Sequence, residues 1–234
     1  MARRAQGVVV TSATLRDNTG NEDQDWQAAD LRTGFRHFSH GGNHSRLPSP
    51  FIYGEQTRII VVSDVEKNDL GQLSSAYRDL IVAAKGGALC LFTSIARLKG
   101  VYKRLASDAR LTHLHLLAQH IDPMDTGTLV DIFRAESDSC LLGTDAVRDG
   151  VDIPGRSLRL MIYDRMPWPR PTILHKARKK LYADEIRGGS FDDFVTRLRL
   201  KQAYGRLVRQ ATDKGVFIML DRAMPSRLKG AFPE

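Results

Sequence analysis

Near its carboxyl end the chain carries Gln202, Gly205, Arg206 and Arg209 within eight residues. We predict a helix over residues 191–210. On such a helix Gln202, Arg206 and Arg209 share one face, because residues three and four apart are neighbours. Two guanidinium groups on one face suit the binding of a triphosphate and the charge that develops in phosphoryl transfer. Gly205 would let a backbone or a nucleotide approach closely. The alternative is an ordinary basic surface helix.

A second polar segment, LGTDAVRDGVDIPG at residues 142–155, begins with Thr144 and Asp145 at the end of an apolar run. A strand end followed by a short helix offers backbone N–H groups to a phosphate. Gly150 and Asp152 follow in the same segment, and the Asp152 carboxylate could accept a hydrogen bond from a ribose hydroxyl.

Hydroxyl side chains follow two further apolar runs. Thr93 and Ser94 end the run ALCLFTS, and Ser12 and Thr14 lie in a Ser-Ala-Thr element after GVVV. Small hydroxyl groups suit contacts with the phosphates of a nucleic acid. The competing interpretation is that such residues only cap the helix that follows.

The elements that must position these residues are short apolar runs alternating with helix-like stretches. Strands are predicted at residues 7–12, 58–64, 88–94, 111–118, 139–145, 158–164 and 216–221. Helices are predicted at residues 70–85, 94–106, 126–135, 172–186 and 191–210. Continuous apolar strands indicate a sheet covered on both faces, and strand–helix alternation predicts a doubly wound α/β fold. Ligands in such folds bind at the carboxyl ends of the strands.

The charge is unevenly distributed along the chain. Residues 1–149 hold 17 Lys/Arg against 18 Asp/Glu, whereas residues 150–234 hold 18 against 9. The net charge of +8 therefore comes from the last third. This asymmetry is typical of a polyanionic partner such as nucleic acid, although a solvated basic surface is an equal alternative.

Several classes of protein are not expected. No apolar run reaches the roughly 20 residues that span a bilayer, and no secretory signal is recognisable. Two cysteines, Cys90 and Cys140, lie in apolar runs and indicate reduced, buried thiols in a cytoplasmic protein. Two thiols cannot hold an iron–sulfur cluster. The histidines of residues 37–44 match no metal-binding spacing, so we expect no metal site in this chain.

The order of these segments resembles the DinG/XPD branch of superfamily 2 DNA helicases. QAYGRLVR (202–209) is similar to motif VI, LGTDAVRDGVDIPG to motif V, GALCLFTS (87–94) to motif IV, and VTSATL (10–15) to motif III. The resemblance implies a RecA-like second motor domain with a mostly parallel sheet, related to P-loop NTPases. It divides the chain into a leftover motif III strand (1–16), a connection (17–56) and the RecA-like domain (57–234).

The same resemblance implies roles for the residues. Arg206 and Arg209 would be arginine fingers, and Gln202, Gly205, Gly150 and Asp152 would contact the nucleotide. Thr93, Ser94, Thr144 and Asp145 would contact single-stranded DNA, and Ser12 and Thr14 would couple ATP state to DNA binding. ATP and Mg²⁺ would be the cofactors of the intact helicase.

The sequence contains neither a G-x-x-x-x-G-K-[ST] loop nor an apolar strand ending in Asp-Glu-x-His. We therefore expect this chain to be a fragment that needs a first motor domain of the same polypeptide, which would hold Mg²⁺, and to be inactive as an ATPase alone. Two alternatives remain: a non-enzymatic nucleic-acid-binding module with a degenerate helicase fold, and a small-molecule nucleotide-binding enzyme.

Overall fold

The computed structural model describes residues 7–38, 41–148 and 152–233. The chain forms two compact units. The first comprises residues 1–48, 168–198 and 227–231, and the second comprises residues 49–167, 199–226 and 232–234. Among the described residues, no helix is both long and apolar enough to cross a bilayer.

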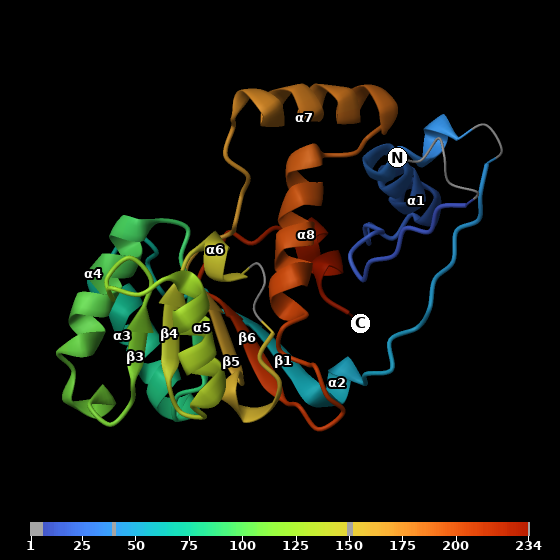
Figure 1. The fold of residues 1–234 in the computed structure, drawn as a ribbon. Coiled ribbons are helices and arrows are strands. Elements are labelled where there is room, and N and C mark those ends of the chain that lie inside the picture. The colour runs from blue at the N-terminus through green and yellow to red at the C-terminus, as the bar shows by residue number, and fades with distance from the viewer. Residues whose placement is uncertain (1–6, 39–40, 149–151, 234) are drawn as a thin grey trace. The chain divides into compact units, whose positions relative to one another are not determined.

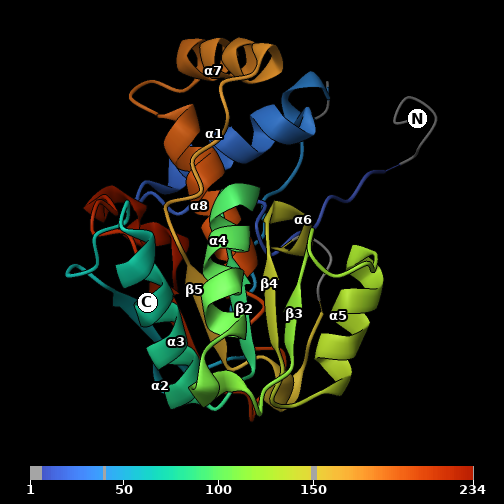
Figure 2. The ribbon, with the colours of Figure 1, turned by 90° about the vertical axis from the view of Figure 1, so that its left-hand side faces the viewer.

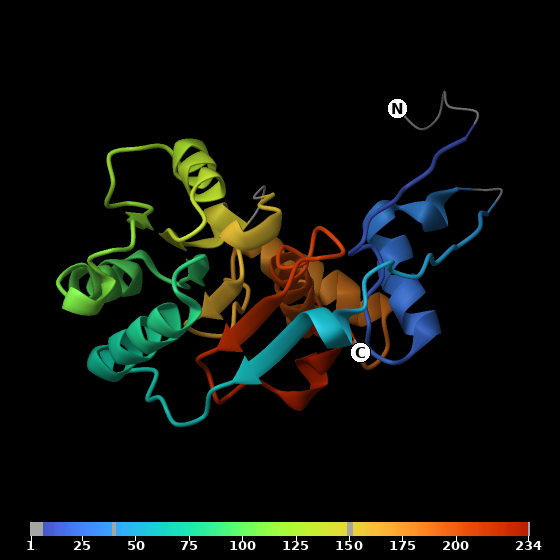
Figure 3. The ribbon, with the colours of Figure 1, turned by 90° about the horizontal axis from the view of Figure 1, so that it is seen from below.

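The second unit is built on a six-stranded sheet with the strand order β1-β6-β5-β2-β4-β3. Every neighbouring pair is parallel. Figures 1 and 3 show the sheet, with β1 beside β6. The strands are β1 (Thr57–Val61), β2 (Ala88–Leu91), β3 (Leu116–Ala118), β4 (Cys140–Gly143), β5 (Leu160–Tyr163) and β6 (Gly215–Met219).

Helices cover both faces of this sheet, as the doubly wound α/β prediction requires. On one face, α3 (Leu70–Ala84) and α4 (Ile95–Ala106) pack on alternate strand residues such as Cys90, Leu142 and Ile162. On the other face, Tyr163 and Tyr204 contact Phe217. Tyr204 is the last residue of α8 (Phe191–Tyr204). Figure 2 shows α3, α4 and α5 (Thr126–Ala135) beside the strands.

The helix boundaries follow from capping side chains. Asp69 accepts hydrogen bonds from the first-turn amides of α3, Ser94 from the Arg97 amide of α4, and Asp125 from two amides of α5. These bonds satisfy donors that a helix start leaves unpaired. The predicted helices at 70–85, 94–106 and 126–135 are thereby confirmed to within about one residue.

The buried-thiol prediction is also confirmed for this unit. Cys90 and Cys140 are free and fully buried on the neighbouring strands β2 and β4. Burial raises the pKa of Cys140 to about 12 and that of Cys90 well above its usual value.

The remaining short helices of the second unit are α2 (Tyr53–Gln56), α6 (Asp145–Arg148), η3 (Ala109–Leu111) and η4 (Gly155–Ser157). η3 corrects one prediction, because the strand expected over residues 111–118 is confined to β3 at 116–118. Asp108 caps η3 by accepting a hydrogen bond from the Arg110 amide, and this helix includes the first residue of the predicted strand.

The first unit contains α1 (Glu22–Thr33), η2 (Phe35–His37), α7 (Ile173–Glu185) and the first part of α8. The last 3₁₀ helix, η5 (Ser226–Ala231), lies almost wholly in this unit. Helix α1 occupies part of the predicted connection; it starts at the Asn21 cap and ends at Gly34, which has a positive φ of 72°. The predicted division at residues 16 and 56 stays a prediction.

The strand predicted at residues 7–12 is not formed. These residues have no regular secondary structure, and Val9 is 91% exposed. A run of this kind forms a strand only when a neighbouring strand satisfies its backbone groups and its side chains are covered. Neither condition is met for these residues in the structure.

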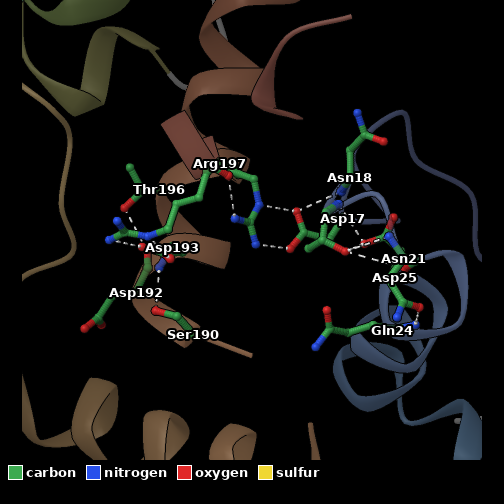
Figure 4. Close-up of polar contacts among 12 residues, drawn as sticks. Asp17, Asn18, Asn21, Gln24, Asp25, Ser190, Asp192, Asp193, Thr196 and Arg197 are labelled. Carbon is green, nitrogen blue, oxygen red and sulfur yellow. Dashed lines mark hydrogen bonds and ion pairs between the residues drawn. The ribbon is translucent and has the colours of Figure 1, made fainter. Parts of the chain in front are cut away.

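A buried ion pair holds the first unit together. Arg197 donates to both carboxylate oxygens of Asp17, from Nε at 2.8 Å and from Nη2 at 2.6 Å. Figure 4 shows the two side chains facing each other. Both residues are at most 5% exposed. Burial lowers the pKa of Arg197, but its hydrogen bonds to Asp17 and the charge of that carboxylate outweigh burial and raise the pKa above its usual value.

We predict that Asp17→Ala destabilises the first unit by about 3–5 kcal/mol, because it leaves a buried guanidinium without its carboxylate. Both tryptophans, Trp26 and Trp168, belong to this unit, so urea unfolding followed by tryptophan fluorescence reports on it. The matched control is Asp23→Ala, which removes an exposed carboxylate of α1 and should cost less than about 1 kcal/mol. Equal losses for the two variants would contradict the role of the pair.

Candidate nucleotide and nucleic-acid site

Polar residues follow the strands at the carboxyl edge of the sheet. The backbone pairs Phe92 N to Gly143 O (2.8 Å) and Gln119 N to Leu142 O (2.9 Å) continue the pairing of β2, β4 and β3. Thr93 and Thr144 therefore stand next to each other at neighbouring strand ends. The structure thus places two residues predicted to contact nucleic acid at the edge where ligands of doubly wound sheets bind.

Thr93 is fixed by a carboxylate that follows β5. Asp164 accepts a hydrogen bond from the Thr93 amide at 3.0 Å and from the Thr93 hydroxyl at 3.5 Å. The same carboxylate accepts from Arg97 Nε of α4 at 2.5 Å. Ser94 caps α4 by accepting from the Arg97 amide at 3.2 Å. One buried carboxylate thus joins the end of β5 to the loop after β2 and to the start of α4.

Asp164 is fully buried. Desolvation raises its pKa, and the hydrogen bonds from Arg97 and Thr93 oppose this rise. A second carboxylate, Asp221, is 4% exposed and extends the network at the end of β6. It pairs with Lys67 Nζ at 3.2 Å and accepts from the Met166 amide at 3.2 Å. The carboxyl edge of β2, β5 and β6 is therefore held by buried charged groups.

Thr144 is held by an amide side chain. Its backbone N–H and its hydroxyl both donate to Gln119 Oε1, at 3.0 and 2.9 Å. Gln119 Nε2 donates in turn to the Thr126 hydroxyl at the start of α5. Gln119 is 6% exposed, so its amide is satisfied within the protein.

The segment after Thr144 forms the short helix α6. The predicted strand end is thus followed by a short helix, as expected. Asp145 is exposed and pairs with Arg148 at 2.9 Å, and Arg148 itself is buried. Gly150, predicted to contact the nucleotide, lies outside the described residues.

The helix predicted to carry Gln202, Arg206 and Arg209 on one face is shorter than expected. Helix α8 ends at Tyr204, so only Gln202 lies in it. Gly205 directly follows the helix and lies within two overlapping turns. In these turns the Arg206 amide donates to the Ala203 carbonyl (3.0 Å) and the Leu207 amide donates to the Tyr204 carbonyl (3.0 Å). Glycine favours such helix ends. The prediction that Gln202, Arg206 and Arg209 share one face of a helix is therefore wrong.

The structure nevertheless brings Arg209 to Asp152. Arg209 Nε lies 3.1 Å from Asp152 Oδ1, and the Asp152 side chain is 68% exposed. The Asp213 carboxylate fixes the backbone here by accepting from the Arg209 amide at 2.8 Å and the Gln210 amide at 2.9 Å. Two segments predicted separately from the sequence thus meet through one ion pair.

Gln56 adds a second support to this loop. Its Nε2 donates to three carbonyl oxygens, those of Gln210, Ala211 and Asp213, at 3.1–3.3 Å. Gln56 and Asp213 are at most 9% exposed. The conformation that presents Arg209 is therefore determined by buried polar groups.

Ser12 and Thr14 belong to the first unit. The Ser12 hydroxyl accepts a hydrogen bond from the Thr14 amide at 3.2 Å, and the two hydroxyl groups are 3.2 Å apart. Ser12 is exposed. These bonds are local, and the coupling role of the two residues stays a prediction.

Four residues that shape the site were not singled out as site residues from the sequence: Asp164, Gln119, Asp213 and Gln56. Asp164 is the last residue of one predicted strand and Gln119 directly follows another, so their position at the carboxyl edge could have been inferred from the same rule that selected Thr93. No such signal marks Asp213 and Gln56 in the sequence, because their partners are backbone groups of a loop.

Comparison with known proteins agrees with this arrangement. Residues 77–234 match the family model of the helicase C-terminal domain. The chain is 34% identical over 221 residues to the ATP-dependent helicase DinG of Mycobacterium tuberculosis, covering 90% of this chain and 30% of that protein. It is 32% identical over 241 residues to the ATP-dependent DNA helicase YoaA of Escherichia coli, covering 99% and 35%.

A third relative, the 3′-5′ exonuclease DinG of Bacillus subtilis, is 32% identical over 231 residues, covering 94% of this chain and 24% of that protein. The chain thus spans about a quarter to a third of the length of these relatives. Among solved structures, an XPD helicase shares the fold with a TM-score of 0.51 at 16% identity, covering 70% of this chain and 31% of that one.

The parallel sheet with helices on both faces is therefore a RecA-like helicase fold. The family model covers more than half of the chain, and its match begins within α3 and runs through every predicted motif of the second unit from residue 87 onward. The chain belongs to the helicase C-terminal domain family.

Proposed function

We propose that this chain is the second motor domain of an ATP-dependent DNA helicase. In this proposal Arg206 and Arg209 act as arginine fingers on a nucleotide whose phosphates and Mg²⁺ are held by a first motor domain. The relatives named as ATP-dependent helicases support the class of reaction. The contact between Arg209 and Asp152 carries the assignment of residues, because it joins the two segments predicted to face the nucleotide.

The surroundings of Arg209 suit a phosphate ligand. Its side chain is 35% exposed, and its ion pair uses Nε and one oxygen of an exposed carboxylate. Exposed pairs of this kind contribute little, typically below about 1 kcal/mol. An incoming phosphate oxygen can therefore replace or join Asp152 at low cost, and it would bind the guanidinium with the geometry that arginine favours.

In this proposal the first motor domain, and not this chain, binds Mg²⁺. Among the residues that the structure describes, no group of three or more Asp, Glu, His or Cys side chains could hold a metal ion. ATP supplies the phosphoryl group that is transferred, while this chain contributes positive charge at Arg206 and Arg209. Gln202, Gly205, Gly150 and Asp152 would border the nucleotide.

Thr93, Ser94, Thr144 and Asp145, here called the carboxyl-edge row, suit the binding of single-stranded DNA. Thr93, Ser94, Thr144 and Asp145 would approach the backbone of the strand with hydroxyl groups and backbone amides, which bind phosphates without reading bases. Buried partners already accept the amide and hydroxyl hydrogens of Thr93 and Thr144, so these two residues fix the shape of the edge. The Ser94 hydroxyl accepts from the Arg97 amide and so keeps its own hydrogen for a phosphate. Binding should be dependent on salt and largely independent of sequence.

We expect the 234-residue chain alone to show no ATP hydrolysis above background, with or without single-stranded DNA. The reason is that its sequence has no phosphate-binding loop and no carboxylate pair for Mg²⁺. The measurement is phosphate release at saturating ATP. Clear turnover by the purified chain would favour the alternative of a complete nucleotide-binding enzyme.

In a polypeptide that carries both motor domains, Arg209→Ala should lower the DNA-stimulated ATPase rate at least a hundredfold. Loss of an arginine finger typically removes about 10³–10⁵ in rate. The fold should remain, because the backbone amide of residue 209 keeps its bond to Asp213. Steady-state ATPase assays and circular dichroism check both points.

The matched control is Arg222→Ala. The Arg222 side chain is 67% exposed and lies 3.9 Å from Glu66, so the variant removes the same charge at a residue to which the proposal gives no contact with the nucleotide. It should hydrolyse ATP at a near-normal rate. If Arg209→Ala did so too, the arginine finger would lie elsewhere.

A further inference from the structure

A groove in the second unit has no role in the site described so far. It is lined by Lys99, Tyr102, Lys103, Ala106 and Ser107 of α4 and its end, and by His120 and Ile121 after β3. Its volume is about 690 Å³. Residues 99, 102, 103 and 106 are three and four apart, so they share one face of α4. The groove therefore runs along this face, against the loop that follows β3.

The groove carries positive charge. Lys99 and Lys103 are exposed, and neither ammonium group has an ion-pair partner among the described residues. A carboxylate close to Tyr102, that of Asp122, is half-buried and accepts from the Ala118 amide at 2.7 Å. Asp122 thus satisfies the backbone, and the two lysines remain available to an anion.

The groove is also partly apolar. Tyr102 is partly buried, while Ile121 is 36% exposed. His120 is held with a positive φ of 68°, which is uncommon for a residue with a side chain. A ring surface between two cations is the combination that binds single-stranded nucleic acid, where bases stack and phosphates contact Lys or Arg.

Both walls of the groove belong to segments that also contribute to the carboxyl edge of the sheet. Ser94 is the cap of α4, the helix that supplies one wall. Gln119, which holds Thr144, directly precedes His120 in the other wall. The groove and the carboxyl edge therefore share α4 and the loop after β3.

We propose that the α4 groove binds the continuation of the single strand, with its phosphates on Lys99 and Lys103 and a base against Tyr102 or His120. The inference rests on the proposed binding of single-stranded DNA at the carboxyl edge. It adds a second binding site for the same DNA strand, so that the chain would contact a longer stretch of single-stranded DNA.

The test compares a double variant with a control of equal charge. Lys99→Gln with Lys103→Gln removes two cations from the groove. Lys85→Gln with Arg104→Gln removes one cation between α3 and β2 and one from the opposite face of α4, where Arg104 donates only to the Gly100 carbonyl. All four positions are exposed, and circular dichroism checks that both double variants fold.

Affinity is measured by fluorescence anisotropy with short (about 5-nucleotide) and long (about 20-nucleotide) oligothymidylates over a range of salt concentrations. Two lost phosphate contacts should lower the slope of log K against log salt by about 1.4 for the long strand, since each contributes about 0.7. When salt is lowered tenfold, from 1 M to 0.1 M, the affinity of the groove variant for the long strand should therefore rise about 25-fold less than that of the unmodified chain. The short strand, which fits within the carboxyl-edge row, should bind both double variants as it binds the unmodified chain.

Each outcome has a distinct meaning. An unchanged slope for the groove variant, with normal binding by the unmodified chain, would overturn the groove and leave the proposed function intact. An equal loss in both double variants would also overturn it, because the effect would be one of net charge. If the unmodified chain bound neither oligonucleotide, the proposed DNA-binding function itself would fail.

Discussion

The carboxylate of Asp164 organises the functional edge of the sheet. It is fully buried, yet it accepts hydrogen bonds from the Thr93 amide and from Arg97. A buried carboxylate is costly unless such partners satisfy it, and removing one partner leaves a buried charge unpaired. The end of β5, the loop after β2 and the start of α4 must therefore keep their relative positions, and Thr93 is fixed at this edge.

The same principle recurs along this edge. Gln119 fixes Thr144, and Asp213 with Gln56 fixes the backbone at Arg209. In each case a buried polar side chain satisfies backbone groups of a loop and presents a more exposed neighbour. Such preorganisation suits phosphate binding, because the donors lose little further freedom when the ligand arrives. The ion pair of Arg209 with Asp152 then links the two segments that are proposed to face the nucleotide.

The sequence predicted the fold through local signals. Continuous apolar runs located β2, β4 and β5, and the capping residues Asp69 and Asp125 located helix starts. Predictions failed where tertiary structure decides: residues 7–12 lack a neighbouring strand, the strand expected at 111–118 is confined to β3, and α8 ends at Tyr204, before Arg206 and Arg209. The predicted site residues were identified by motif order, whereas Asp213 and Gln56 act on loop carbonyls and amides that no sequence pattern reveals.

The central claim is that the carboxyl edge of the sheet binds nucleic acid. It is tested most directly by amide chemical shifts of the ¹⁵N-labelled chain during titration with oligothymidylate. The account predicts that the largest shifts occur at Thr93, Ser94, Thr144 and Asp145. Shifts confined to the opposite edge, where β2 and β4 begin at Ala88 and Cys140, would contradict it.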